Sequence, residues 1–124
     1  MKKLLLIITM VPLLLATQCN EDDNGIACTE EARAGLNITI KDAITNAYLN
    51  EGVSVLATDG SYSETLMSFD LAEPIFSGAY EREGNYTITV SKTGYVTYTS
   101  EVISVTSDVC HVIPQQRTIL LQPE

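Results

Sequence analysis

The chain has 124 residues, with 7 Lys and Arg against 16 Asp and Glu, and its formal net charge is −9. This length favours a single domain, and the negative charge argues against nucleic-acid binding, which needs a cationic surface to displace phosphate counterions. One His and no Trp leave little material for acid–base catalysis, a zinc site or a broad aromatic platform for sugars.

Residues 1–18 have the order of a secretory signal peptide. Two lysines follow Met1, and an apolar run then extends from Leu4 to Ala16. That run is too short to cross a bilayer, which needs about 20 residues. The segment that ends at Cys19 resembles the lipobox of bacterial lipoproteins, although Gln18 stands where Gly or Ala is usual. The resemblance implies cleavage after residue 18 and a lipid on Cys19, whereas the alternative is an ordinary secreted protein with Cys19 unmodified.

Residues 19–25 form a short acidic segment that contains Glu21, Asp22 and Asp23. Its composition predicts a flexible tether. The segment resembles the acidic export signal that follows the lipidated cysteine in surface lipoproteins of the Bacteroidetes, and a plain solvated linker is the alternative. A calcium site at Asp22 and Asp23 is disfavoured because two carboxylates in a flexible segment fall short of the six to eight oxygen ligands that calcium takes. The expected location is the outer membrane, either on the cell surface or facing the periplasm.

Residues 26–124 are predicted to form one all-β domain. Apolar and polar residues alternate in several short segments that are rich in Val, Ile, Thr and Tyr. Seven strands are expected, near residues 36–40, 53–55, 62–69, 75–82, 86–90, 95–105 and 117–122. Seven short strands separated by turn residues indicate a sandwich or barrel, and no segment is long enough for an independent helix.

Turn residues divide the predicted strands. The strongest turn signals are Asp59-Gly60, Glu83-Gly84-Asn85 and Thr93-Gly94. Gly78 falls inside the strand predicted for residues 75–82, where it predicts a bulge.

Two stretches resemble carboxypeptidase regulatory-like domains. Residues 38–55 have the family's first strand, its turn and the start of its second strand, with Asn46 in place of the usual Gly and Tyr48 in place of the usual Pro. Residues 84–95 have the family's Gly-x-Tyr, strand and Gly-Tyr order. The resemblance covers about residues 34–121 and implies a seven-stranded antiparallel Greek-key sandwich of the prealbumin (transthyretin-like) type. Such domains serve as accessory modules, including in surface systems that take up glycans.

Three cysteines are present, and each has an expected role. If Cys19 carries the lipid, Cys28 and Cys110 remain. An exported chain meets an oxidising compartment, so we predict a Cys28–Cys110 disulfide between the segment before the first strand and the loop before the last.

The residues offer little catalytic chemistry. His111 is the single imidazole, so any Ser–His–acid triad would have to use it. A dyad of His111 with Cys110 is geometrically poor, because adjacent strand residues point to opposite faces. We expect His111 to bond to the backbone of its own loop. The acidic residues lie near turns, which is typical of a solvated surface rather than of a paired catalytic site.

Tyrosines are the best binding candidates. Tyr86 lies on the same face of its predicted strand as Ile88 and Val90, which are expected in the core, whereas Tyr48 and Tyr62 lie near loops. If Tyr98 packs inward together with Val96, Tyr95 faces outward at a turn. Tyr48, Tyr62 and Tyr95 are therefore the residues proposed to stack on a sugar or peptide, and isolated tyrosines that cover sheet edges are the alternative.

The sequence thus predicts a non-enzymatic, lipid-anchored domain of the cell envelope, with no cofactor, metal or catalytic residue. It would act as an interaction or accessory module toward another envelope protein, and strand addition at a sheet edge is one route. A carbohydrate-binding accessory module is the second hypothesis, and a hydrolase is the third.

Overall fold

A computed structural model describes residues 27–124 of the chain. The predicted signal peptide, the lipidation site Cys19 and the acids Glu21, Asp22 and Asp23 lie outside the described residues. Within residues 27–124 there are nine strands: β1 (Ala34–Asp42), β2 (Ser54–Asp59), β3 (Tyr62–Thr65), β4 (Met67–Ser68), β5 (Ile75–Tyr80), β6 (Gly84–Ser91), β7 (Tyr98–Thr99), β8 (Ile103–Val105) and β9 (Gln115–Leu121). No helix in this part of the chain is long and apolar enough to cross a membrane.

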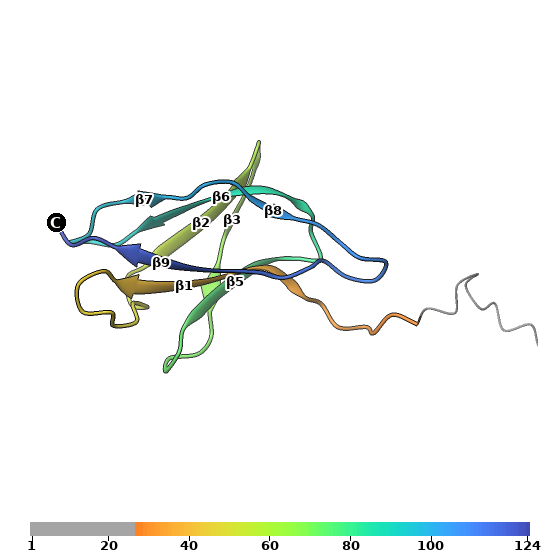
Figure 1. Ribbon diagram of the computed structural model, residues 1–124, viewed down its shortest axis with the longest axis horizontal. Coiled ribbons are helices and arrows are strands. Elements are labelled where there is room, and N and C mark those ends of the chain that lie inside the picture. The colour runs from red at the N-terminus through yellow and green to blue at the C-terminus, as the bar shows by residue number, and fades with distance from the viewer. Residues whose placement is uncertain (1–26) are drawn as a thin grey trace, which may run out of the picture.

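The strands form two sheets that face each other (Figure 1). One sheet has the order β4-β5-β1-β9, and the other has the order β3-β2-β6-β7, with β8 also paired to β6. This arrangement confirms the predicted all-β sandwich. One pairing departs from the antiparallel expectation, because β9 runs parallel to β1, with Ile40 opposite Ile119.

The core lies between the sheets and follows the period-two pattern of the sequence. In β1 the side chains of Leu36, Ile38 and Ile40 are fully buried, and in β6 those of Tyr86 and its two alternating neighbours are as well. Alternate strand residues point to opposite faces, so a regular apolar pattern buries one face of each strand against the other sheet. The remaining buried apolar residues are Val55, Ala57, Leu66, Phe76, Ala79, Ile103, Val105, Val112, Ile119 and Leu121.

The strand predicted for residues 62–69 is in fact two strands in different sheets. β3 pairs with β2, and β4 pairs with β5. The chain crosses between the sheets at Leu66, whose side chain is buried in the core. The crossing explains why one continuous strand was the wrong prediction: residue types on both sides of Leu66 suit a strand, but their partners differ.

Gly78 has a packing role and does not form a bulge. The β1–β5 register passes from Asn37↔Ser77 to Leu36↔Gly78 with no inserted residue, so the predicted bulge is wrong. A Cβ on Gly78 would collide with Cδ2 of Leu66 and approach the Glu64 carboxylate to 2.6 Å. The crossing at Leu66 therefore requires a residue without a side chain on β5.

The strand predicted for residues 95–105 is also divided, into β7 and β8. Ser100 causes the interruption: its N–H donates to the Ile88 carbonyl, and its hydroxyl accepts from the Ile88 N–H, both at 2.8 Å. A side-chain oxygen thus takes the place of a backbone carbonyl in the ladder, and regular pairing stops until Ile103. These two divisions account for nine strands where seven were expected.

The turn before β6 lies earlier than predicted. Gly84 is the first residue of β6, and the chain turns where Ala79 and Glu81 have positive φ angles of 53° and 51°. The Arg82 N–H donates to the Ala79 carbonyl at 3.2 Å and closes this turn. The predicted turns at Asp59-Gly60 and Thr93-Gly94 are confirmed.

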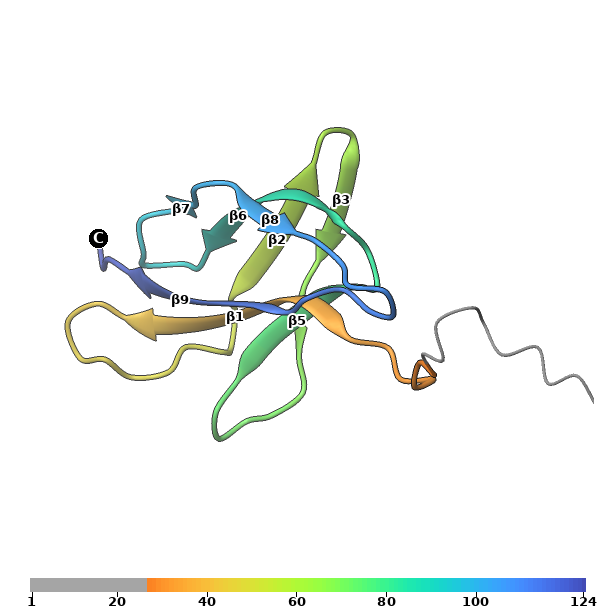
Figure 2. The same ribbon diagram turned by 45° about the vertical axis from the view of Figure 1, so that its right-hand side comes forward.

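The Cys28–Cys110 disulfide is present, as predicted, with 5.3 Å between the Cα atoms. It fastens the segment before β1 to the loop between β8 and β9. Figures 1 and 2 show this loop and the N-terminal segment at one end of the sandwich, and the C-terminus at the opposite end. The disulfide therefore fixes the end of the sandwich from which the N-terminal segment departs.

Candidate functional site

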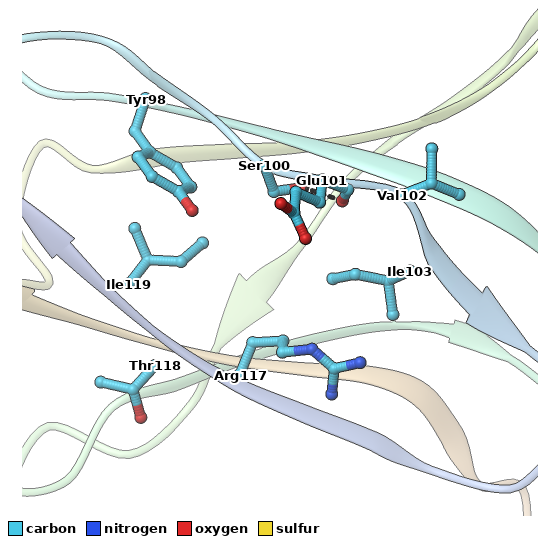
Figure 3. A pocket seen from close by; sticks show the side chains of 8 residues that line it. All are labelled: Tyr98, Ser100, Glu101, Val102, Ile103, Arg117, Thr118 and Ile119. Atoms are coloured by element: carbon cyan, nitrogen blue, oxygen red, sulfur yellow. Dashed lines mark hydrogen bonds between the residues drawn. The ribbon is translucent and has the colours of Figure 1, made fainter.

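A cleft of about 270 Å³ lies between β9 and the chain that joins β7 to β8 (Figure 3). β9 is the edge of one sheet, and β7 and β8 border β6 on the facing sheet. The cleft therefore occupies a side of the sandwich on which the sheets are not joined by a shared strand. Its lining residues are Tyr98, Ser100, Glu101, Val102, Ile103, Arg117, Thr118 and Ile119.

Arg117 occupies an inward-facing position on β9. Because alternate residues of β9 point the same way, its side chain lies on the same face as those of Ile119 and Leu121. Those two residues are buried, yet Arg117 itself is exposed. Its guanidinium points into the cleft (Figure 3). The one hydrogen bond of this side chain within the described residues is from Nη1 to the Gln116 carbonyl, at 2.7 Å. Most of the donors of this side chain are therefore left for a ligand or for water.

The other two arginines of residues 27–124 are neutralised by carboxylates. Arg33 pairs with Glu31, and Arg82 pairs with Asp59 at 3.1 Å. Arg117 forms no ion pair with any described residue. An arginine without a carboxylate partner is notable in a chain that carries 16 acids.

The opposite wall of the cleft carries Glu101 and Tyr98. The Glu101 carboxylate points toward the β9 side, and the Tyr98 ring faces Ile119 (Figure 3). Glu101 and Arg117 do not form an ion pair, so each remains free to contact a third group. Ile103 and Ile119, both buried, provide an apolar floor. Polar atoms nevertheless make up most of the exposed lining, so the cleft suits a polar ligand better than an apolar one.

The three tyrosines predicted to face a ligand lie in separate surroundings. The Tyr62 hydroxyl donates to Glu64 Oε1 at 2.8 Å, which raises the pKa of Tyr62, and the Arg82 guanidinium lies 3.6 Å from its ring centroid. Tyr48 is 43% exposed, with the Lys41 ammonium 4.8 Å from its ring centroid.

Tyr95 packs against the core, and its hydroxyl donates to Asp42 Oδ2 at 2.7 Å. The expectation that Tyr95 faces outward is wrong, because residues 96 and 97 lie outside any strand and the alternation expected between Tyr95 and Tyr98 is not kept. Tyr95 instead forms an isolated bridge with Pro123. Tyr98 faces the other sheet, as parity predicts, but the open cleft leaves 38% of it exposed. Val96, expected to pack inward, is exposed.

Sequence reasoning missed the cleft residues Tyr98, Glu101 and Arg117 as a group. One signal was available: in the last strand, the alternation of Ile119 and Leu121 places Arg117 on the inward face. The proximity of Glu101 depends on the break at Ser100, which strand patterning does not reveal.

A second polar group surrounds His111, which is 7% exposed. Nδ1 donates to Glu81 Oε1 at 2.9 Å, and Nε2 lies 3.0 Å from the Thr29 hydroxyl. The expected bond from the ring to its own loop is therefore wrong. The backbone N–H of His111, and not the ring, bonds within the loop, to Asp108 Oδ1 at 2.9 Å. The ring instead joins the segment before β1 to the turn between β5 and β6.

The Thr29 hydroxyl, the His111 ring and the Glu81 carboxylate are linked in the same order as the members of a hydrolase triad. However, the Glu81 carboxylate also accepts the backbone N–H groups of Arg33 at 2.8 Å and Val112 at 3.2 Å. These bonds, that of Arg33 first, hold the pKa of Glu81 below its usual value. The group therefore ties three chain segments together, and none of its members lines the cleft. Its geometry fits a structural clamp.

Neither a metal site nor a known family assigns a function to these residues. Within residues 27–124, no three His, Cys, Asp or Glu side chains are grouped so that they could hold a metal ion. The chain matches no protein-family model and no curated protein. The features that bear on function are therefore the cleft, the disulfide and the N-terminal sequence.

Proposed function

We propose that this protein is a lipid-anchored, non-enzymatic domain of the cell envelope that acts as an interaction or accessory module. The signal-peptide pattern and Cys19 supply the anchor, and the acidic residues Glu21, Asp22 and Asp23 supply the tether and export signal. A disulfide is in keeping with export to an oxidising compartment. The membrane is thus one partner, through the lipid, and another envelope protein or a glycan is the other.

The position of the disulfide is the observation that carries this proposal. Cys28 follows the tether closely, and its bond to Cys110 holds the chain at the end of the sandwich formed by the β8–β9 loop. An anchor attached there leaves the far end, where β1 turns toward β2 (Figure 1), accessible to a partner. The flank that carries the cleft is accessible as well. The domain therefore has an anchored end and a free surface.

The turn after β1 supports the resemblance to carboxypeptidase regulatory-like domains. Asn46, at the position of the usual Gly, has a φ of 62°, and its N–H donates to the Asp42 carbonyl at 2.9 Å. Asn is one of the few residues with a side chain that adopts this left-handed conformation readily. The substitution therefore preserves the turn that the family's glycine makes, and we propose a prealbumin-like, Greek-key arrangement on this basis.

Membrane fractionation of cells that produce the full chain tests the anchor. Cys19→Ala, or treatment with globomycin to block lipoprotein signal cleavage, should change how the protein is processed, and Cys19→Ala should remove it from the membrane fraction. Cys19→Ala protein that stays membrane-bound, as the wild type does, would contradict lipid anchoring. Proteinase shaving of whole cells then separates surface exposure from a periplasmic orientation, with Glu21→Gln, Asp22→Asn and Asp23→Asn combined as the export variant.

A carbohydrate-binding accessory module is the second candidate. The exposed tyrosine, arginine and glutamate around the cleft favour it, because these side chains can contact sugar rings and hydroxyls.

A further inference from the structure

Arg117 is a charged residue on the inward face of β9. Strand parity places Arg117 where Ile119 and Leu121 contribute to the core, and a buried, unpaired guanidinium there would be costly. The open cleft avoids that cost by leaving Arg117 in solvent. An apolar residue at this position would extend the apolar face of β9, whereas the arginine places a charged group in the cleft.

The two charges of the cleft restrict the chemistry of a ligand. Arg117 offers only hydrogen-bond donors, and Glu101 offers only acceptors when ionised. An anionic ligand would be attracted by Arg117 and repelled by Glu101. A cationic ligand would be attracted by Glu101 and repelled by Arg117. A neutral polyhydroxyl satisfies both, because each hydroxyl donates one hydrogen bond and accepts others. The net charge of −9 further disfavours a polyanion.

The remaining walls suit a ring with an apolar face. Tyr98 presents a rigid aromatic side chain, and its hydroxyl has no hydrogen-bond partner among the described residues. The floor of Ile103 and Ile119 is apolar. A volume of about 270 Å³ is slightly below the range of about 300–1,000 Å³ typical of drug-sized ligands, so the cleft suits one small unit of a longer chain.

We propose that this cleft binds one sugar unit of a neutral oligosaccharide, with Tyr98 beneath the ring and with Arg117 and Glu101 bonded to neighbouring hydroxyls. The proposal rests on the proposed accessory function and gives it a ligand class and a site. It also explains why the donor and the acceptor stand on opposite walls without pairing.

A different role for Arg117 would be to protect the β9 edge. Inward-pointing charges on edge strands prevent edge-to-edge association of sheets. This role requires neither Tyr98 nor Glu101, so the variants below distinguish it from sugar binding.

The test is a binding measurement on the full-length wild-type lipoprotein in detergent. The probes are maltohexaose, cellohexaose and mannohexaose as neutral chains, polygalacturonate as an acidic chain, and a library of extended peptides. At least one neutral chain should bind, and Tyr98→Ala, Arg117→Ala and Glu101→Gln should each weaken its binding about tenfold or more. Tyr80→Ala and Arg33→Ala are matched controls, because both residues are exposed and lie outside the cleft, and they should leave affinity unchanged.

Several results would overturn the sugar site. These are binding of polygalacturonate or peptides without any neutral chain, binding of no probe, and self-association of Arg117→Ala with unchanged sugar affinity. Size-exclusion chromatography of every variant detects the last result. Because Cys19→Ala fractionation is measured separately, the anchor and the sugar site can fail independently.

Discussion

The Tyr95 hydroxyl donates a 2.7 Å hydrogen bond to Oδ2 of Asp42, the last residue of β1. Oδ1 of the same carboxylate accepts the N–H groups of Ile44 at 2.7 Å and Thr45 at 2.9 Å. Asp42 therefore organises the loop that leaves β1 and also binds the turn that follows β6. The loop at this end of the sandwich is held by one buried carboxylate.

Tyr95→Phe should lower the free energy of unfolding by about 1 kcal/mol, because it removes one hydrogen bond to a carboxylate and keeps the ring that packs on the core. Urea unfolding followed by circular dichroism measures the change. Tyr98→Phe is the matched control, since its hydroxyl has no partner among the described residues, and it should be neutral. Equal effects of the two substitutions would contradict the role assigned to Asp42.

Acid should weaken the fold through the same carboxylate. The N–H of Thr45, then the Tyr95 hydroxyl and the N–H of Ile44, hold the pKa of Asp42 below its ordinary value of 3.8. A carboxyl whose pKa is lower in the folded state stabilises the fold above the unfolded pKa, and this contribution is lost as the pH falls through the folded pKa. The free energy of unfolding should therefore decline below about pH 4.

Asp42→Asn should make that decline shallower while lowering stability at pH 7. Unfolding in urea at a series of pH values between 2 and 7 measures both effects. Curves of the wild type and Asp42→Asn that stay parallel over this range would show that Asp42 does not contribute to the acid sensitivity.

The all-β class could be predicted because β1 and β6 each bury one face completely. Leu36, Ile38 and Ile40 alternate with polar residues, and this period-two pattern survives in the fold. The disulfide could also be predicted, because assigning Cys19 to lipid leaves one pair. The first inference depends on a pattern that is local in the sequence, and the second depends on the number of cysteines in the chain.

The breaks in the strands could not be predicted in the same way. Leu66 is a good strand residue whose neighbours pair with different sheets, and Ser100 interrupts a ladder with its own hydroxyl. The cleft depends on where Tyr98 and Arg117 meet, and that is set by the placement of two edge strands. Strand patterning reports burial along one strand, but it does not report which strands face each other.

The disulfide should contribute a large share of stability. It closes a separation of 82 residues, for which the chain-entropy account gives roughly 4–5 kcal/mol. The double variant Cys28→Ala, Cys110→Ala should lose about that amount in urea unfolding, or less if native strain offsets part of it. Mass analysis of the purified full chain without reductant should show one intramolecular bridge, and two free thiols at these positions would refute it.

His111→Ala should cost about 1–3 kcal/mol, because it leaves the Glu81 carboxylate and the Thr29 hydroxyl without their ring partner. Thr29→Val, which removes only the partly buried contact between the Thr29 hydroxyl and Nε2, should cost less. If the group were a hydrolase triad instead of a clamp, the wild type would hydrolyse p-nitrophenyl acetate above the buffer rate and Thr29→Val would abolish it. We expect no such activity in either protein.

Gly78→Ala should destabilise the fold by about 1–3 kcal/mol, because the added methyl group overlaps Cδ2 of Leu66 and crowds the Glu64 carboxylate. The cause can be isolated with a double-mutant cycle. Leu66→Ala is itself destabilising, but it removes the side chain that the methyl group meets, so Gly78→Ala should cost less in that background. Urea unfolding of the four proteins gives the coupling energy between the two sites. Additive effects would mean that the crossing at Leu66 does not set the requirement for glycine on β5.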